Sequence, residues 1–387
     1  MPSMEEANVF MGPIRILQFG LASTKYYGTE NVILNLYRHI DRSRYQFDFL
    51  VDHKYQAIDY EAEVEALGGH VYRQHYTPAE KSQRGYISPA QLWSLHPEIQ
   101  GGAHLNLDCY GYDNYGAQLI AAAKKRGFPI RIIHMHSALR GPSVPLHTQI
   151  RHTLTLPFIT RSGSQLLACS TKAGRYGFQR RPYEILPNAI ETDKFTFDQA
   201  VRSRLREQYG LTDKLVLGFA GRFVPEKNPE FLLKILREIN QRCSHAHLVL
   251  LGDGRLEDRL RHTVRQMGLE NVSFQGCVDN VYQWMQAFDV LLLPSQYEGL
   301  PMVLVEAQAA GLMCFTSDNV SKDAAITPRL SFLSLKDPAA WAEVILHTDF
   351  SFDRRKGQAE VTAAGYDINE SSKRLEAIYD SLFHQKS

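Results

Sequence analysis

The chain of 387 residues is 44% hydrophobic and 22% charged, which is the composition of a globular protein and excludes a disordered or fibrous one. Lys and Arg total 43 and Asp and Glu total 42, so the chain as a whole has no net field that would attract nucleic acid. Its length exceeds that of one ordinary hydrophobic core and predicts two domains.

The five cysteines are scattered, odd in number and without CxxC spacing. This argues against a disulfide framework and a zinc site and favours a reducing compartment. The first residues, MPSMEEANVFMG, lack the basic and apolar regions of a signal peptide. No apolar run reaches the roughly 18 residues of a membrane helix. We therefore expect a cytoplasmic protein without a membrane span, and peripheral contact with the inner face of the membrane stays an open alternative.

The first half of the chain alternates short apolar runs with amphipathic stretches, which is typical of βα units and a parallel sheet. The predicted strands are residues 14–20, 47–51, 104–108, 130–135 and 166–170. Helical patterns lie between them, for example over 29–40 and 115–127. We interpret residues 182–193 as the connection to a second domain.

The same alternation starts again after this connection. The predicted strands are 215–221, 246–252, 272–276, 289–294, 312–317 and 329–335, and the predicted helices are 229–242, 255–268, 281–288 and 301–311. A last helix is expected at about Asn369–Phe383. The pattern predicts an α/β protein with two doubly wound domains, over 12–190 and 191–366, and a C-terminal helix within 367–387 that packs back on the first domain.

Ligands of such folds bind beyond the carboxyl ends of the strands, so the loops there are where a site is expected. The most informative loop is in PSQYEGLPMVLVEAQAAG, residues 294–311. Pro301 suits the first turn of a helix, and the free N–H groups of that turn favour an anion such as phosphate. Gly299 leaves room for close approach of the backbone to a ligand.

Glu306 follows within the predicted helix, among apolar neighbours. A carboxylate is costly to bury without partners, and the vicinal hydroxyl groups of a sugar are suitable partners. The alternative is a structural residue that faces solvent or pairs with an arginine.

The segment GRFVPEKNPEFLL, residues 221–233, also follows a predicted strand and precedes a helix. Arg222 and Lys227 lie five residues apart in this short loop, so both can point at one ligand and neutralise a diphosphate. The alternative is a solvated basic surface. Further candidates are Asp253 in GDG (252–254), which either binds a polar ligand or caps the next helix, and Val278, whose backbone is expected to contact a base.

Residues 215–311 resemble the nucleotide-sugar domain of family 4 glycosyltransferases, which are retaining enzymes of the GT-B fold with two Rossmann-like domains that face each other across a cleft. The family's E-x7-E signature matches Glu298 and Glu306, and its basic pair matches Arg222 and Lys227.

The resemblance spans nearly the whole chain and is nearest to the capsule and exopolysaccharide members. Residues 186–195 resemble the family's P-N-G-[IV]-D segment, with Ala189 in place of the usual glycine. The family's sugar-contacting histidine corresponds to His136, for which the alternative is a structural role. Gly28 lies in the first βα loop, where Tyr27 replaces one of the family's two glycines.

The resemblance implies a role for each of these residues. Glu306 would bind the ribose hydroxyls of the donor and Glu298 the hydroxyls of the transferred sugar, while Arg222 and Lys227 would stabilise the leaving diphosphate. His136 would contact the sugar. The remaining donor-binding residues would be Gly28, Asp253, Val278, Gly299, Leu300, Met302 and Val303.

The function implied is that of a retaining hexosyltransferase. It would move a hexose or N-acetylhexosamine from a nucleotide diphosphate-sugar, with UDP as the expected nucleotide, to a glycan or lipid-linked acceptor in surface polysaccharide synthesis. In the front-face mechanism proposed for this family, the leaving phosphate itself accepts the proton of the acceptor. No D-x-D occurs in the chain, so neither a metal nor another cofactor is expected.

Other functions are weighed against this one. No G-x-G-x-x-G follows a strand and no G-K-[ST] occurs, which argues against a dinucleotide-dependent dehydrogenase and a P-loop NTPase. The alternative from a different class is a non-catalytic nucleotide-sugar-binding partner of another transferase. Segments 106–116 and 172–181 are the candidates for the acceptor side, and the basic residues of 172–181 either contact anionic lipid or form a solvated helix end.

Overall fold

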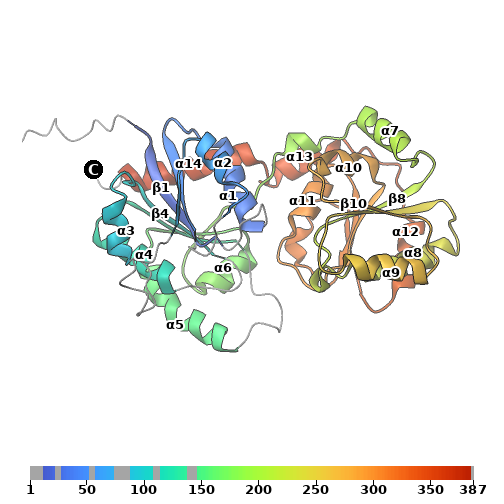
Figure 1. The fold of residues 1–387 in the computed structure, drawn as a ribbon, viewed down its shortest axis with the longest axis horizontal. Helices are drawn as coiled ribbons and strands as arrows, with labels where there is room; N and C mark the ends of the chain where they lie inside the picture. Colours follow the sequence, from blue (N-terminus) through green and yellow to red (C-terminus); the bar gives the residue numbers. More distant parts are fainter. Residues whose placement is uncertain are drawn as a thin grey trace, which may run out of the picture. The chain divides into compact units, whose positions relative to one another are not determined.

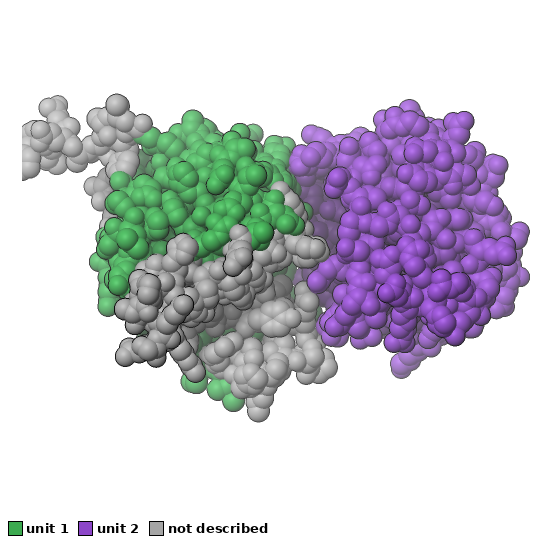
Figure 2. Space-filling model, viewed as in Figure 1, with its two compact units in different colours: residues 1–189, 368–387 green, residues 190–367 purple. Residues whose placement is uncertain are grey.

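The computed structural model describes residues 12–21, 28–51, 57–73, 88–107, 114–136 and 146–384. The chain forms two compact units. Unit 1 comprises Met1–Ala189 and Ile368–Ser387, and unit 2 comprises Ile190–Asp367, as coloured in Figure 2. Unit 2 is therefore an insertion in the sequence of unit 1, which is completed by the last segment of the chain.

Unit 1 is built on a seven-stranded sheet in the order β3-β2-β1-β4-β5-β6-β7, and its described strand pairs are parallel. The strands are β1 (Ile14–Phe19), β2 (Tyr45–Val51), β3 (Val71–Arg73), β4 (Gly102–Leu107), β5 (Ile130–Met135), β6 (Gln165–Ala168) and β7 (Glu184–Ile185). The strand order reverses between β1 and β4, which makes this pair the topological switch point of the sheet.

Helices cover both faces of this sheet (Figure 1). One face carries α1 (Gly28–His39), α2 (Glu61–Ala66) and α14 (Ile368–His384), and the other carries α3 (Pro89–Leu95), α4 (Asn114–Lys125), α5 (Leu146–Ser162) and α6 (Thr171–Phe178). Alternation along β1 divides the core accordingly, because Ile16 packs with the first group and Leu17 and Phe19 pack with the second.

Unit 2 is built on a six-stranded parallel sheet in the order β10-β9-β8-β11-β12-β13. Its strands are β8 (Leu215–Ala220), β9 (Ala246–Leu251), β10 (Val272–Gly276), β11 (Val290–Leu293), β12 (Met313–Ser317) and β13 (Leu330–Leu333). Its helices are α7 (Gln199–Gln208), α8 (Pro229–Asn240), α9 (Glu257–Gln266), α10 (Val281–Ala287), α11 (Met302–Ala309), α12 (Pro338–Leu346) and α13 (Lys356–Ala363), with short 3-10 turns at Thr192–Phe195, Pro225–Lys227 and Lys322–Ala324.

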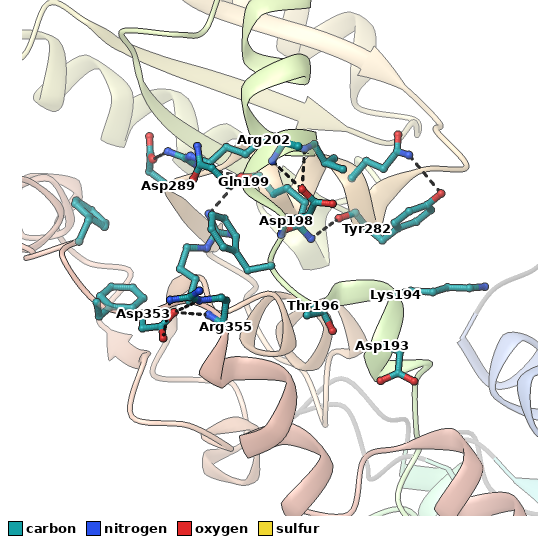
Figure 3. Close-up of a pocket in the computed structure, with 18 residues that line it drawn as sticks. Asp193, Lys194, Thr196, Asp198, Gln199, Arg202, Tyr282, Asp289, Asp353 and Arg355 are labelled. Atoms are coloured by element: carbon teal, nitrogen blue, oxygen red, sulfur yellow. Dashed lines mark hydrogen bonds and ion pairs between the residues drawn. The ribbon is translucent and has the colours of Figure 1, made fainter.

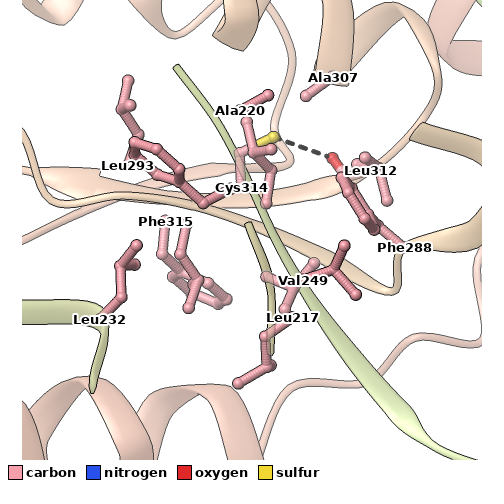
Figure 4. Packing of buried hydrophobic residues seen from close by; sticks show 14 of the residues in the cluster. Leu217, Ala220, Leu232, Val249, Phe288, Leu293, Ala307, Leu312, Cys314 and Phe315 are labelled. Carbon is pink, nitrogen blue, oxygen red and sulfur yellow. Dashed lines mark hydrogen bonds between the residues drawn. The ribbon is translucent and has the colours of Figure 1, made fainter. Parts of the chain in front are cut away.

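The core of unit 2 is one continuous cluster of buried side chains. Figure 4 shows part of it, where Leu217, Val249, Leu293 and Phe315 project from four adjacent strands. These strands are short and almost wholly apolar, as expected where helices cover both faces of a parallel sheet.

The predicted fold class is confirmed, with differences in detail. The edge strands β3 and β7 were not predicted, since two or three residues are too few to show alternation. Helix α5 was missed because its apolar residues lie on both its buried and its exposed faces. Pro301 is the N-cap of α11 and not part of its first turn. Among the helices that the structure describes, none has both the length and the apolar content needed to cross a bilayer.

Candidate functional site

The switch point of unit 2 lies between β8 and β11, and the two predicted charged loops leave the carboxyl ends of these two strands. The loop after β8 carries Arg222, whose side chain is exposed, and Lys227. The loop after β11 carries Glu298 and Gly299 and leads into α11. Because neighbouring parallel strands end at the same edge of a sheet, the fold brings these residues to one place.

The two loops are in direct contact. The Lys227 ammonium group and the Glu298 carboxylate form an ion pair, and both side chains are largely buried. The Ser295 hydroxyl donates to the same carboxylate at 3.1 Å. The backbone N–H of Gln296 donates to the Glu226 carbonyl at 2.8 Å, which joins the loops a second time. Lys227 is therefore held beside Glu298, and its charge is partly neutralised there.

The loop after β11 is also anchored on its other side. Glu298 forms an isolated parallel bridge with Val320, and the N–H of Ser321 donates to the Glu298 carbonyl at 3.3 Å. Gly299, Leu300, Met302 and Val303 follow as half-buried residues at the start of α11. The first turn of this helix thus starts directly after the paired carboxylate.

Glu306 lies in the second turn of α11 and is half-buried. Desolvation by burial raises the pKa of its carboxyl group to about 7. No hydrogen bond joins this carboxylate to any residue that the structure describes. A desolvated acceptor without a partner in the protein is suited to accept hydrogen bonds from a polyhydroxylated ligand.

The loop after β9 is packed against the loop after β8. The Phe223 N–H donates to the Asp253 carbonyl, and the Leu256 N–H donates to the Phe223 carbonyl at 3.0 Å. A Cβ atom at Gly252 would lie 2.1 Å from the Gly221 carbonyl oxygen. The glycine is therefore required by the contact between the two loops.

The alternative role considered for Asp253 is not found. Helix α9 has Leu256 as its N-cap and no side-chain cap, so Asp253 does not cap it, and its side chain is exposed. Val278 follows β10 and is half-buried. Since the sheet order is β10-β9-β8-β11, Val278, Asp253, Lys227 and Glu298 lie in successive loops along one rim of the sheet.

His136 follows β5 in unit 1 and is only 5% exposed. Its Nδ1 lies 3.0 Å from the Asn188 side-chain oxygen and its Nε2 lies 2.9 Å from that of Asn106. Burial lowers the pKa of His136 to about 4, so the ring is neutral at physiological pH and one of its nitrogens is an acceptor. One of the two asparagines therefore presents its amide N–H to the ring, because the N and O atoms of an asparagine side chain are interchangeable in assignment.

The buried polar group around His136 extends further into unit 1. The Asn106 amide donates to the Gln18 side-chain oxygen at 3.1 Å, and the ring of His134 lies 3.9 Å from that of His136. Asn106 and Asn188 were not predicted as partners of His136. The signal was present in β4, where His104 and Asn106 alternate with apolar residues in a strand that is buried on both faces.

Gly28 is the first residue of α1, with a φ of +45° and no atom within 4 Å of a Cβ placed there. Residues 22–27, which precede it in the predicted loop, lie outside the described residues, as do residues 108–113 of the candidate acceptor segment 106–116.

Unit 2 has a cavity that is distinct from these loops. It has a volume of 1080 Å³ and is lined by residues from α7, α10 and segments 193–198 and 350–355 (Figure 3). Arg202 and Asp289 form an ion pair on its wall, and Asp289 directly precedes β11. The cavity therefore adjoins the opposite end of β11 from the loop with Glu298. Within the described parts of the chain, no group of three or more His, Cys, Asp or Glu side chains could hold a metal ion.

Comparisons with known proteins fit this arrangement. A family model described as "Glycosyl transferases group 1" matches residues 214–348, which include all four rim loops of unit 2. The putative glycosyltransferase EpsF of Bacillus subtilis is 30% identical over 367 residues, which cover 91% of this chain and 93% of EpsF. The chain belongs to the group 1 glycosyltransferases.

The predicted resemblance to family 4 glycosyltransferases is thereby confirmed. A UDP-Gal:alpha-D-GlcNAc-diphosphoundecaprenol alpha-1,3-galactosyltransferase of Escherichia coli is 30% identical over 140 residues, which cover 35% of this chain and 36% of that protein. The crystal structure of HepE of Anabaena in complex with UDP has a TM-score of 0.75 at 16% identity, covering 95% of this chain and 99% of HepE. This likeness shows the GT-B fold, and as a group 1 glycosyltransferase the chain transfers a sugar from a nucleotide-sugar donor.

Proposed function

We propose that this glycosyltransferase transfers a hexose or N-acetylhexosamine from a UDP-sugar to a glycan or lipid-linked acceptor, with retention of the anomeric configuration and without a metal ion. The observation that carries the proposal is the grouping at the switch point of unit 2. A paired Lys227 and Glu298 lie in contacting loops there, and the unpartnered carboxylate of Glu306 follows in α11.

Each charged residue has a role in this proposal. Glu306 accepts hydrogen bonds from the two ribose hydroxyls, which supply the partners that its carboxylate lacks in the protein. Lys227 and Arg222 stabilise the negative charge on the departing diphosphate, and the N–H groups of Gly299 to Val303 add to this stabilisation. Glu298 holds hydroxyls of the transferred sugar. Its ion pair with Lys227 keeps both side chains oriented before the donor binds.

The other predicted residues also have roles in this proposal. Asp253 and Val278 contact the donor from the neighbouring loops of the rim. His136 contacts the sugar, which requires it to exchange one of its bonds to Asn106 or Asn188. Gly28 allows close approach of the diphosphate or acceptor to the start of α1.

The choice of UDP is supported by the HepE structure, which contains UDP, and by the partly matching galactosyltransferase, whose name specifies UDP-Gal. The same name supports a lipid-linked acceptor, because it specifies a diphosphoundecaprenol-linked sugar. A role in surface polysaccharide synthesis and a cytoplasmic location at the inner face of the membrane follow as parts of the same proposal.

Thermal denaturation with a panel of nucleotides tests the donor. We expect UDP to stabilise the protein and GDP, ADP and dTDP to do so much less. At about 100 times its dissociation constant, a ligand adds about 2.7 kcal/mol. Glu306→Ala should abolish the effect of UDP while leaving the ligand-free protein folded. Equal stabilisation by all four nucleotides would contradict the choice of UDP.

Turnover of UDP-glucose, UDP-galactose and UDP-N-acetylglucosamine then tests the reaction. We expect one of them to release UDP, with a rate unchanged by EDTA, and NMR of the product to show the anomeric configuration of the donor. Tight binding of the donor with no release of UDP, with or without acceptor, would favour a non-catalytic binding partner instead.

A further inference from the structure

Although positive and negative charges are balanced over the whole chain, one part of unit 1 is strongly basic. Residues 114–183 contain eleven Lys and Arg and no Asp or Glu. The other 317 residues carry 32 Lys and Arg against 42 Asp and Glu. The described parts of this segment form α4, β5, α5, β6 and α6, and β5 and β6 are neighbouring strands. One side of unit 1 therefore concentrates positive charge.

Helix α5, within this basic part, has apolar side chains on two faces. Leu156 and Ile159 are buried in the core, whereas Ile150, Leu154 and Phe158 are 51%, 74% and 53% exposed. These three residues follow one another at intervals of four and so form one stripe along the helix. They are half of the six large hydrophobic side chains that are exposed in the described parts of the chain. Figure 1 shows α5 at the periphery of unit 1.

Cations border this apolar stripe at the end of α5. Arg161 follows Phe158 by three residues, is exposed and lies on the same face of the helix. Lys124 of α4 donates to the Arg161 carbonyl at 2.7 Å, and its neighbour Lys125 is also exposed. The C-terminal ends of α4 and α5 thus place three cationic side chains together.

Helix α6 adds further cations on its side. It packs against α5 through the rings of His152 and Tyr176, which are stacked with centroids 4.5 Å apart. Lys172 and Arg175 of α6 are exposed, and neither forms an ion pair with a residue that the structure describes. Their charges are therefore available to a ligand.

We propose that the exposed faces of α5 and α6 and the end of α4 form a docking surface for an anionic phospholipid bilayer. An exposed apolar stripe on a helix, bordered by Lys and Arg, matches the boundary between acyl chains and phosphate groups. Ile150, Leu154 and Phe158 enter the bilayer surface, and the cations contact lipid phosphates. A two-fold dimer through this surface is disfavoured, because like charges would face each other.

The inference deepens the proposed function, since a lipid-linked acceptor lies at such a surface, but it can be tested separately. The full-length protein is sedimented with vesicles of phosphatidylcholine, or of phosphatidylcholine with about one-third phosphatidylglycerol. We expect sedimentation with the anionic vesicles only. At a high salt concentration, which screens the attraction between surface charges, the sedimentation should be lost. No sedimentation with anionic vesicles at low salt overturns the proposal.

Paired variants locate the surface. Leu154→Ser with Phe158→Ser should weaken vesicle binding at least tenfold, because both side chains leave water on binding. The matched control is Leu95→Ser in α3, which removes a side chain that is 60% exposed in the same unit. Arg161→Ser with Arg175→Ser should weaken binding about 30-fold, since each cation contributes about a factor of five. Arg265→Ser with Lys336→Ser removes two exposed cations of unit 2 and should have no effect.

Each outcome bears on the inference. Vesicle binding that survives the Leu154 and Phe158 changes, or is lost equally in Leu95→Ser, overturns the assignment to α5. A dimer in analytical ultracentrifugation that the same two changes dissociate assigns the stripe to a second copy instead. All variants should keep the thermal stability and UDP binding of the wild type. If the protein binds UDP but not vesicles, only this inference is wrong. If it does not bind UDP, the proposed donor is wrong and the vesicle result is unaffected.

Discussion

The carboxyl-terminal rims of the two sheets are built in different ways. In unit 2, the loops after β8, β9 and β11 are joined by hydrogen bonds and carry charged groups such as Lys227 and Glu298. In unit 1, the polar groups around His136 at the rim are buried, and its ring is held between the side chains of two asparagines. The rim of unit 2 thus presents charged groups, whereas His136 in the rim of unit 1 has a buried, hydrogen-bonded support.

The largest effect should come from removing the cation of the unit 2 rim. Lys227→Ala should lower the rate of sugar transfer by about 10²–10³, the usual loss for one donor that stabilises developing charge. It also leaves Glu298 without its ion-pair partner. Steady-state release of UDP measures the effect. Lys336→Ala, which removes an exposed lysine of the same unit, is the control and should retain the wild-type rate. Near-normal turnover in Lys227→Ala would remove the functional contrast between the rims.

The contact between loops in unit 2 can be broken at Gly252. The residue has a φ of +125°, and a Cβ atom there would meet the Gly221 carbonyl oxygen at 2.1 Å. Gly252→Ala should destabilise the protein by about 3 kcal/mol in urea denaturation, of which about 1–2 kcal/mol is backbone strain. Gly268→Ala separates the two causes, because Gly268 has a φ of +63° with no atom within 4 Å. Equal losses in both variants would show that the loop contact adds nothing.

The raised pKa of Glu306 leads us to expect that the stability of the ligand-free protein depends on pH. Its folded-state pKa is raised from 4.5 to about 7, so the stability that its protonated form contributes is lost as the pH rises through this window. Glu306→Gln should therefore be more stable than the ligand-free wild type at pH 8, by about 1–2 kcal/mol, and equally stable below pH 4.5. This gain in stability is smaller than the full shift in pKa would give, because the Glu306 side chain keeps some contact with water. A gain that does not depend on pH would contradict this account.

The smallest effect is expected in the rim of unit 1. Asn188→Ala removes one hydrogen bond to His136 and should cost about 1 kcal/mol of stability. The nitrogen NMR signals of the His136 ring should then lose the pattern of one fixed tautomer. Asn240→Ala removes the two hydrogen bonds that join Asn240 and Asn271 in unit 2, and it should cost at least as much stability without changing these signals. Unchanged His136 signals in Asn188→Ala would contradict the proposed support.

The difference between the rims also explains what could be predicted from the sequence. Lys227 and Glu298 were expected near each other because they follow strands whose carboxyl ends share one edge. Their ion pair was not expected, since it depends on loop conformation. The surroundings of His136 could not be predicted, because Asn106 and Asn188 lie 30 and 52 residues away and reach it only through the register of the sheet. Local patterns therefore indicated the loops and missed the buried contacts.

The return of the chain to unit 1 has a consequence for its biosynthesis. The N–H of Ile190 donates to the Tyr366 carbonyl at 2.9 Å, so the outgoing and returning segments pair beside each other. The core of unit 1 includes Ile368, Leu375 and Tyr379 of α14. A ribosome releases all of unit 2 before these residues emerge. We therefore expect the domain that is encoded second to complete its fold first, while the domain that is encoded first awaits its final helix.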